Sequence, residues 1–306
     1  MKILFLGSSH FSKVVLQTML ENKLQVAAVV TAPDKEVGRG HKMQANEVKT
    51  FALANNIKVF CSSSVKKDFE KIKEMDFDLS VVASFGQILP QEFLDYKLCL
   101  NVHPSALPKY RGASPIQNAI LNGEKQTAVT IMKVGLKVDS GDIALQQNVE
   151  ILQDEMYSAL EEKLARKGGE MIAQAISLLK QNKLKFTSQN EQGATYVTKF
   201  AKEDGLMDFS KPREKIFNQV RALSENLGTY FFLKGQKIKV FAVKTADEKF
   251  EINQIANDKN HFLIGCKDGS IEILSCLSPS GKKLNGKDFL NGFKPQGEFV
   301  NEFCRS

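Results

Sequence analysis

The first half of the chain alternates short apolar runs with longer segments whose apolar residues recur at helical spacing. Lys2–Gly7, Gln25–Thr31 and Cys99–His103 are typical of buried strands, and residues 11–21 place apolar side chains on one helical face. Strands that alternate with helices favour a mostly parallel sheet with helices on both faces. The alternation therefore predicts an α/β, doubly wound domain of the Rossmann-like type, and it restricts the fold more than any other feature.

Further segments continue this alternation. We expect strands at 58–60 and 79–84, helices at 45–55 and 65–75, and a long helical stretch over 155–182. The pair Gly168-Gly169 inside that stretch allows a break into two helices. The end of the stretch sets the boundary of the first domain, residues 1–182.

The pattern changes after residue 182. Residues 183–205 are polar and predict a connecting segment, and residues 210–223 then predict one helix. Short strand-like runs with glycine turns follow, at 229–233, 236–243, 251–255, 262–265 and 270–277. Close spacing of short strands predicts a small, OB-like β-barrel in a second domain, residues 206–306.

The composition excludes several classes of protein. Of the 306 residues, 42% are hydrophobic and 25% are charged, which is close to the average of globular domains. The apolar runs are far shorter than a membrane span, and the first residues do not form a signal peptide, so we expect a cytoplasmic protein. Five scattered cysteines without a CxxC pair, and four scattered histidines, predict neither disulfides nor a metal site.

The net charge is +7, and the excess of lysine and arginine lies in the last third of the chain. A basic accessory domain fits a polyanionic partner such as nucleic acid, but the charge taken alone slightly favours an ordinary lysine-rich surface. The loop at residues 33–42 is also partly basic. Either Arg39 and Lys42 contact phosphates, or the loop is a solvated surface segment.

The first strand-to-helix turn is Gly7-Ser-Ser-His10. It lacks the GxGxxG spacing that brings a pyrophosphate close to a helix N-terminus, so the sequence disfavours a nicotinamide-dependent dehydrogenase. The site is expected elsewhere, beyond the carboxyl ends of the strands.

Polar residues with catalytic potential lie in two loops. Asn101 and His103 are two residues apart at a strand end, which places them on one face, and the prolines at 104 and 108 force an ordered turn after them. Asp139 and Asp142 lie in a glycine-containing loop. An amide, an imidazole and a carboxylate together can stabilise an oxyanion and move a proton. A purely structural role for His103 is the alternative.

The segment 101–117 resembles the Asn-x-His and Ser-Leu-Leu-Pro signature of folate-dependent formyltransferases, and residues 138–143 resemble their Asp-x-Gly loop. Three further segments, 33–42, 196–208 and 278–283, are similar to motifs of the methionyl-tRNA formyltransferase family. Ala106 departs from the signature, where a leucine is usual, and His41 replaces a common lysine. Residues 223–228 lack the Pro-Trp-Pro motif that relatives have there.

This resemblance implies an activity in translation initiation. The enzyme would transfer the formyl group of 10-formyltetrahydrofolate to the α-amine of methionyl initiator tRNA by direct attack, through a tetrahedral intermediate. Asn101 would donate a hydrogen bond to the anionic oxygen, and Asp139 would orient His103. His103 would stabilise the same oxygen if protonated, or accept the proton of the amine if neutral.

The resemblance also implies binding residues. The folate would contact a set of residues in three loops: Phe85, Gly86, Gln87, Ile88, Leu89, Ser105, Ala106, Leu107, Pro108 and Asp142. The tRNA would contact basic residues of both domains: Arg39, Lys42, Lys202, Lys282 and Lys283. We expect a monomer without a metal and without membrane association. The alternatives are a formyltransferase for a small amine, a formyl-folate hydrolase, or a non-catalytic RNA-binding protein.

Overall fold

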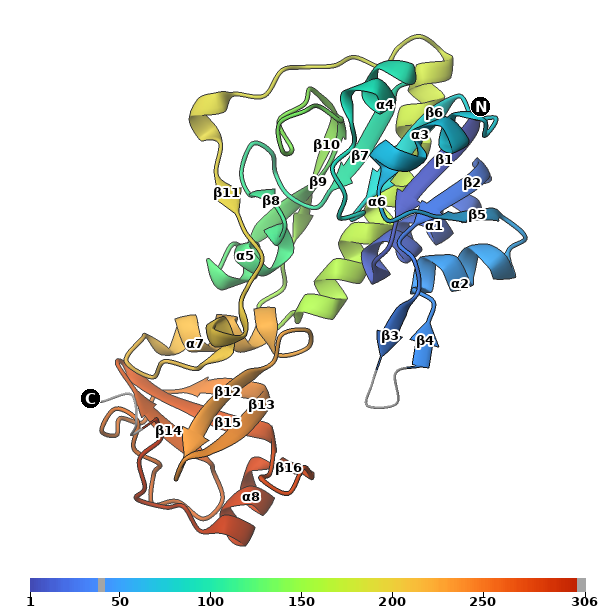
Figure 1. The fold of residues 1–306 in the computed structure, drawn as a ribbon. Helices are drawn as coiled ribbons and strands as arrows, with labels where there is room; N and C mark the ends of the chain where they lie inside the picture. Colours follow the sequence, from blue (N-terminus) through green and yellow to red (C-terminus); the bar gives the residue numbers. More distant parts are fainter. Residues whose placement is uncertain (38–41, 302–306) are drawn as a thin grey trace. The chain divides into compact units, whose positions relative to one another are not determined.

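The computed structural model describes residues 1–37 and 42–301, which form two compact units (Figure 1). The first unit comprises Met1–Pro115, Gln126–Glu150 and Leu160–Val197. The second comprises Ile116–Lys125, Ile151–Ala159 and Thr198–Ser306. Each unit is described by itself below.

The first unit is built on a seven-stranded sheet in the order β10-β9-β7-β6-β1-β2-β5. Its strands are β1 (Lys2–Gly7), β2 (Gln25–Thr31), β5 (Lys58–Cys61), β6 (Leu79–Ala83), β7 (Cys99–His103), β9 (Gln126–Lys133) and β10 (Ile143–Glu150). The five strands from β5 to β7 run parallel, whereas β9 is antiparallel to both of its neighbours. The prediction of a mostly parallel α/β sheet is confirmed.

Helices follow the strands as the alternation predicts. They are α1 (His10–Glu21), α2 (Glu47–Ala54), α3 (Val65–Lys73), α4 (Gln91–Tyr96) and α6 (Tyr157–Lys180). Helix α1 starts at a capping box, in which the side chains of Ser9 and Ser12 each bind the other residue's backbone N–H. This cap satisfies amide groups that a helix end otherwise leaves without partners.

Helix α6 is continuous through Gly168 and Gly169, so the break that these residues allow does not occur. The glycines serve close packing instead. A Cβ on Gly168 would lie 2.4 Å from Cγ1 of Val102 in β7, and a Cβ on Gly169 would lie 2.5 Å from Cβ of Thr18 in α1. The missing side chains let the helix approach both elements closely.

Two short pairings complete the first unit. The hairpin of β3 (Lys35–Val37) and β4 (Lys42–Gln44) flanks residues 38–41, which are outside the described part of the chain. Strand β11 (Tyr196–Val197) pairs in parallel with β8 (Arg111–Gly112), after the 3-10 turn η1 (Glu191–Gly193). Residues 183–197, which the sequence indicates as a connection, therefore pack within the first unit.

The second unit contains a five-stranded antiparallel sheet. Strands β12 (Thr229–Leu233), β13 (Gln236–Ala246), β15 (Gly269–Leu277) and β14 (Leu263–Cys266) are neighbours in this order, and β16 (Lys283–Asn285) pairs with β15. Isolated bridges run from β14 through residues 254–255 and 299–300 to Leu233 of β12. They connect the two edge strands and thus support the predicted barrel-like closure.

Helical segments accompany this sheet. They are α5 (Pro115–Leu121), η2 (Lys202–Gly205), α7 (Arg213–Leu223) and α8 (Gly286–Phe293). The predicted strand at 251–255 is wrong, because residues 252–253 form a turn in which Asn253 has φ 70°, so only single bridges form there. The core is rich in aromatic side chains, among which Phe262 and Phe289 stack. Within residues 1–37 and 42–301, no helix is long and apolar enough to cross a membrane.

Candidate active site

Asn101, His103 and Asp139 converge in the first unit. Asn101 and His103 lie on β7, and Asp139 lies in the loop between β9 and β10. The Nδ2 atom of Asn101 donates to Oδ1 of Asp139 over 3.4 Å, and Nδ1 of His103 lies 3.6 Å from Oδ2. One carboxylate thus faces an amide and an imidazole that strand alternation places on the same side of the sheet.

The imidazole of His103 is buried, and both of its nitrogens are directed at oxygen atoms. Its Nε2 lies 3.0 Å from the carbonyl oxygen of Tyr110. Because a carbonyl can only accept, Nε2 carries the proton and donates. Nδ1 is therefore the nitrogen that faces Asp139 and that can exchange a proton in the direction of this carboxylate.

The Asp139 side chain is fixed by backbone as well. Its Oδ2 accepts a hydrogen bond of 2.8 Å from the N–H of Gly112. Gly112 has φ 113°, and a Cβ there would lie 2.2 Å from the carbonyl oxygen of Val197. Only glycine fits this position, because the backbone is left-handed and the neighbouring strand is close.

Side chains of β9 and β10 form hydrogen bonds to the backbone of the turn after β7. Thr130 donates to the carbonyl oxygen of Ser105 over 2.7 Å, and Gln146 donates to that of Leu107 over 2.9 Å. The peptide bond between Leu107 and Pro108 is cis. Ser105 and Leu107 are buried, while Ala106 and Pro108 are partly exposed.

The segment after β6 contains two buried apolar side chains and one exposed one. Phe85 and Leu89 are buried in the core of the first unit, whereas 88% of the Ile88 side chain is exposed. Gln87 donates to the carbonyl oxygen of Ser62 over 2.7 Å and accepts from the N–H of Val65 over 3.0 Å. The side-chain amide of Gln87 therefore stabilises the start of α3.

The remaining residues singled out in the sequence are dispersed. The carbonyl oxygen of Asp142 accepts from the N–H of Lys133 over 2.9 Å. Lys202 in η2, Lys282 directly before β16 and Lys283 in β16 are exposed on the second unit. Lys42 begins β4, and Arg39 lies outside the described residues.

Three residues of this site are missing from the sequence-based set. Tyr110 and Gly112 bind His103 and Asp139 through their backbone, and Gln189 donates to the carbonyl oxygen of Asp139 over 2.9 Å. Backbone contacts leave little trace in side-chain patterns, although the Tyr-Arg-Gly run directly after the proline turn is a usable signal. Gln189 is 50 residues from Asp139 in a polar segment, and no local pattern indicates it.

The arrangement can donate a hydrogen bond to a developing oxyanion and take up a proton. It contains no cysteine or serine aimed at the trio among the contacts of the described residues. Across residues 1–37 and 42–301, no three His, Cys, Asp or Glu side chains are grouped so that they could hold a metal ion.

Comparison with known proteins decides the family. Residues 1–176 match the formyl transferase family, and residues 199–294 match the formyl transferase C-terminal domain. The methionyl-tRNA formyltransferase of Halalkalibacterium halodurans is 37% identical over 300 residues, which cover 95% of each chain. That of Syntrophomonas wolfei is 34% identical over 301 residues, which cover 96% of each chain. The chain belongs to the methionyl-tRNA formyltransferase family.

Solved structures support the same fold. A sugar 3N-formyl transferase, WlaRD, superposes with a TM-score of 0.68 at 24% identity, covering 93% of this chain and 98% of its own. HypX from Aquifex aeolicus gives a TM-score of 0.69 at 19% identity, and the match covers 97% of this chain and 50% of HypX. The family membership and the α/β fold predicted from sequence are both confirmed.

Proposed function

We propose that this enzyme transfers the formyl group of 10-formyltetrahydrofolate to the α-amine of methionyl initiator tRNA, and thereby supports translation initiation. The observation that carries the proposal is that the side chains of Asn101 and His103 both face the carboxylate of Asp139. Relatives named methionyl-tRNA formyltransferase along the whole chain support the choice of acceptor.

Asn101 acts on the charge that develops at the formyl oxygen when the amine attacks. Its Nδ2 is directed at Asp139 over a long distance of 3.4 Å, so the amide can turn its second N–H to an oxyanion at little cost. A fixed donor of this kind stabilises the transition state more than the ground state.

Asp139 and His103 handle the proton that the amine loses. The Asp139 side chain is 17% exposed and is the member of the pair within reach of solvent and substrate, whereas 5% of the His103 side chain is exposed. We infer that Asp139 receives the proton directly or through water, and that the protonated carboxyl then donates to the unprotonated Nδ1 of His103. The Tyr110 carbonyl keeps Nε2 protonated and fixes the ring.

The residues after β6 fit one face of a flat heterocycle whose edges are polar. The exposed Ile88 side chain offers an apolar surface, and nothing lies within 4 Å of where a Cβ of Gly86 would stand. Binding sites of this kind combine apolar walls with a few polar backbone groups, which Ala106 and Asp142 supply in the other two loops. The bound 10-formyltetrahydrofolate supplies the formyl carbon, and the residues of these loops orient this carbon beside Asn101.

The outer face of β12 and β13 fits the 3′ end of the tRNA. Lys237 and Lys239 are exposed and pair in register with the partly exposed Phe232 and the buried Tyr230, and Nζ of Lys237 lies 3.3 Å from the centroid of the Tyr230 ring. Burial, and then the charges of Lys239 and Lys202, lower the pKa of Lys237. Basic side chains interleaved with aromatic rings are typical of barrel faces that bind single-stranded nucleic acid.

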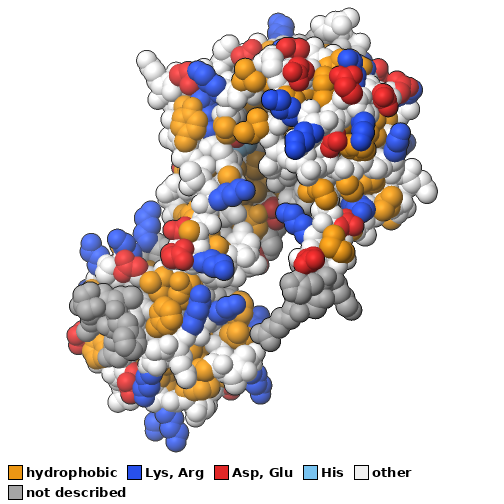
Figure 2. Space-filling view, viewed as in Figure 1, with side chains coloured by type: hydrophobic (Ala, Val, Ile, Leu, Met, Phe, Trp, Pro, Cys, Tyr) orange, Lys and Arg blue, Asp and Glu red, His pale blue; other side chains and the backbone are white. Residues whose placement is uncertain are grey.

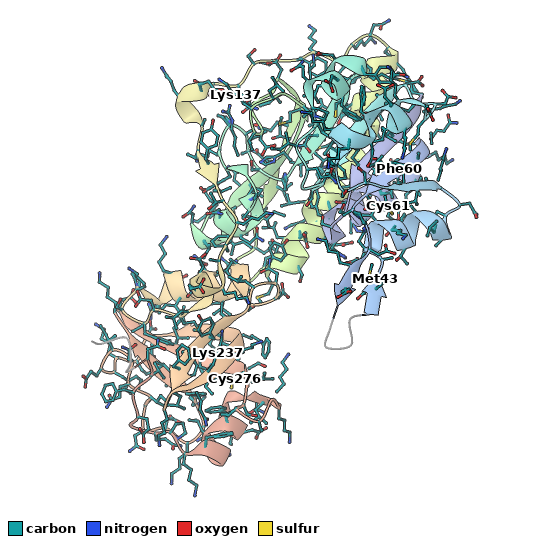
Figure 3. All side chains as sticks on the ribbon, viewed as in Figure 1. Met43, Phe60, Cys61, Lys137, Lys237 and Cys276 are labelled. Carbon is teal, nitrogen blue, oxygen red and sulfur yellow. The ribbon has the colours of Figure 1, made fainter. Side chains whose placement is uncertain are left out.

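Basic and hydrophobic side chains also lie together on this part of the second unit (Figure 2). Figure 2 shows basic side chains beside hydrophobic ones on the second unit, in the region where Figure 3 labels Lys237. Lys283, whose Nζ lies 4.8 Å from the centroid of the Phe241 ring, extends the basic surface along β13. The proposed tRNA contacts are Lys202, Lys282 and Lys283, together with Arg39 and Lys42 of the first unit, and this face adds Lys237 and Lys239 to them.

The deciding experiment measures formyl transfer from 10-formyltetrahydrofolate to methionyl initiator tRNA, with glycinamide ribonucleotide and water as competing acceptors. Preference for the charged tRNA supports the proposal. Transfer to the small amine, or hydrolysis alone, would overturn the acceptor, and tight tRNA binding without turnover would overturn the enzymatic role. We further propose that residues 1–182, together with the part of the segment 183–205 that packs in the first unit, carry the chemistry, that the rest of 183–205 connects, that 206–306 bind tRNA, and that the enzyme is monomeric and cytoplasmic.

A further inference from the structure

A polar segment beyond α6 lies along both loops of the candidate active site. Thr187 exchanges two backbone hydrogen bonds with Ile143, and the carbonyl oxygen of Thr195 accepts from the N–H of Arg111 over 2.8 Å. In Figure 1 this segment leads from the end of α6 to β11, beside β8. Residues 187–197, here called the strap, therefore touch the loop that carries Asp139 and the turn that follows His103.

Gln189 of the strap uses both ends of its side chain. Its Nε2 donates to the carbonyl oxygens of Asp139 and Gly141, over 2.9 and 2.7 Å. Its Oε1 accepts from Nε and Nη2 of Arg111, over 3.1 and 2.8 Å. A carbonyl only accepts and a guanidinium only donates, so the amide has one possible orientation, and both of its N–H groups are used.

Arg111 gives Gln189 a fixed support. Its side chain is fully buried, and it forms an ion pair with Glu191 over 2.7 Å and donates to the Tyr196 hydroxyl over 2.9 Å. The Glu191 carboxylate, followed by Tyr196, raises the pKa of Arg111 further. Because a guanidinium is planar and rigid, this network sets the position of the Gln189 amide.

The backbone that Gln189 binds needs such support. Asp139 has φ 47°, in the left-handed region, which costs about 1 kcal/mol or more for a residue with a side chain. A conformation of this kind persists only where surrounding contacts hold it. The same residue presents the carboxylate that meets Asn101, His103 and Gly112.

We propose that Gln189 is a positioning residue for catalysis, which holds the Asp139 loop so that the carboxylate lies against Asn101 and His103. The inference rests on the proposed function, and it assigns a role in the chemistry to a segment that the sequence indicates only as a connection. Gln189 touches no reacting atom and acts through the backbone of Asp139 and Gly141.

The test is Gln189→Glu, which separates the two ends of the side chain. Glutamate keeps the acceptor for Arg111 and strengthens that contact, but it loses both donors and places a carboxylate oxygen against two carbonyl oxygens. We expect a folded protein whose kcat is ~10–100-fold lower, since a misplacement of about 1 Å at a reacting centre has effects of this size. KM for tRNA should stay within about threefold of the wild-type value, because the Asp139 loop does not control tRNA binding.

A spectroscopic measurement reads the carboxylate directly. In protein labelled with 15N-glycine, the amide of Gly112 reports on its hydrogen bond to Asp139, and we expect this resonance to move in Gln189→Glu. The matched control is Gln192→Glu, the same change at an exposed position of the strap. The control should leave both kcat and the Gly112 resonance unchanged.

Two results would overturn the inference. One is a Gln189→Glu enzyme with the kcat and the Gly112 resonance of the wild type. The other is unfolding of both Gln189→Glu and the shape-conserving Gln189→Met, which would make Gln189 a requirement for folding alone. If the wild type shows no formyl transfer, the proposed function fails, while the Gly112 resonance still decides whether Gln189 positions Asp139.

Discussion

At the scale of single residues, Asn101 is the only side chain of the trio whose proposed task is purely to donate a hydrogen bond. Asn101→Ala removes this donor and leaves the pair of His103 and Asp139 in place. We expect kcat to fall ~10²–10³-fold, as is typical when one oxyanion donor is removed. The folate and tRNA affinities should change little, because the interaction forms mainly in the transition state.

Steady-state kinetics with both substrates, beside Asn148→Ala, make this comparison. Asn148 is an exposed residue of β10 in the same sheet, so its replacement should leave kcat unchanged. If Asn101→Ala retains more than about a third of the wild-type kcat, the oxyanion role is wrong.

The residues of the site differ in how far the sequence predicts them. Asn101, His103 and Asp139 can be singled out because their chemistry and spacing are both local signals. Gln189 cannot, because its function depends on a contact across 50 positions that only the tertiary fold creates. For Gln87 the sequence suggests a binding role, but the structure shows a structural one. Its side-chain amide is hydrogen-bonded to the backbone of Ser62 and Val65.

At the scale of elements, the glycine pair in α6 shows how packing overrides local preference. Alanine favours a helix interior by about 1 kcal/mol over glycine, so propensity alone predicts that Gly169→Ala stabilises the protein. Here the added Cβ would lie 2.5 Å from Cβ of Thr18 and 3.0 Å from the carbonyl oxygen of Val15. We expect a loss of about 1–3 kcal/mol in the free energy of unfolding, as is usual for overpacking.

Denaturant titrations test this expectation, and Gly292→Ala is the matched control. Gly292 also lies in a helix, but nothing stands within 4 Å of the added Cβ, so this change should be neutral or should stabilise by up to about 1 kcal/mol. A higher midpoint for Gly169→Ala than for the wild type would contradict the packing argument.

Helix α1 also begins at a pH-sensitive contact. The hydrogen bond from His10 to Glu47 in α2, together with the charges of Glu47 and Glu161 and a contact with Glu162 in α6, raises the pKa of His10. Because the pKa of His10 is raised in the folded state, protonation of the imidazole stabilises the fold. This stabilisation is fully present at a pH below the ordinary pKa near 6.5, and it disappears as the pH rises through the folded pKa.

Thermal unfolding of His10→Gln measures this contact. We expect the variant to be less stable than the wild type by about 0.5 kcal/mol at pH 5.5, a value typical of half-exposed ion pairs, and to match it near pH 9. A difference that grows with pH would show that the charged imidazole is not the stabilising form.

At the scale of the whole molecule, the alternation of strands and helices up to β7, the long helix α6 and most strands of the second unit were predictable, because period and length distinguish strands from helices. The strands β9 and β10 and the short helices α4, α5 and α8 were not among the predicted elements. The errors fall where a backbone must turn for reasons of packing. Asn253 interrupts an apolar run with a left-handed φ of 70°, and residues 183–197 join the first unit through backbone pairing that polar composition conceals. The choice of acceptor rests on relatives along the whole chain and on the basic face of the second unit.

The basic surface leads to a prediction about tRNA affinity rather than rate. Lys282 and Lys283 are exposed on the second unit, and the double change to glutamine removes two charges without touching the trio. Binding should weaken, and the slope of log affinity against log salt should become less steep by roughly one to two units, because fewer counterions are released. The control replaces Lys66 and Lys67, two adjacent exposed lysines of α3, by glutamine. Equal salt slopes for the two double variants would remove Lys282 and Lys283 from the tRNA surface, whereas a loss confined to the first variant places the acceptor on this side of the barrel.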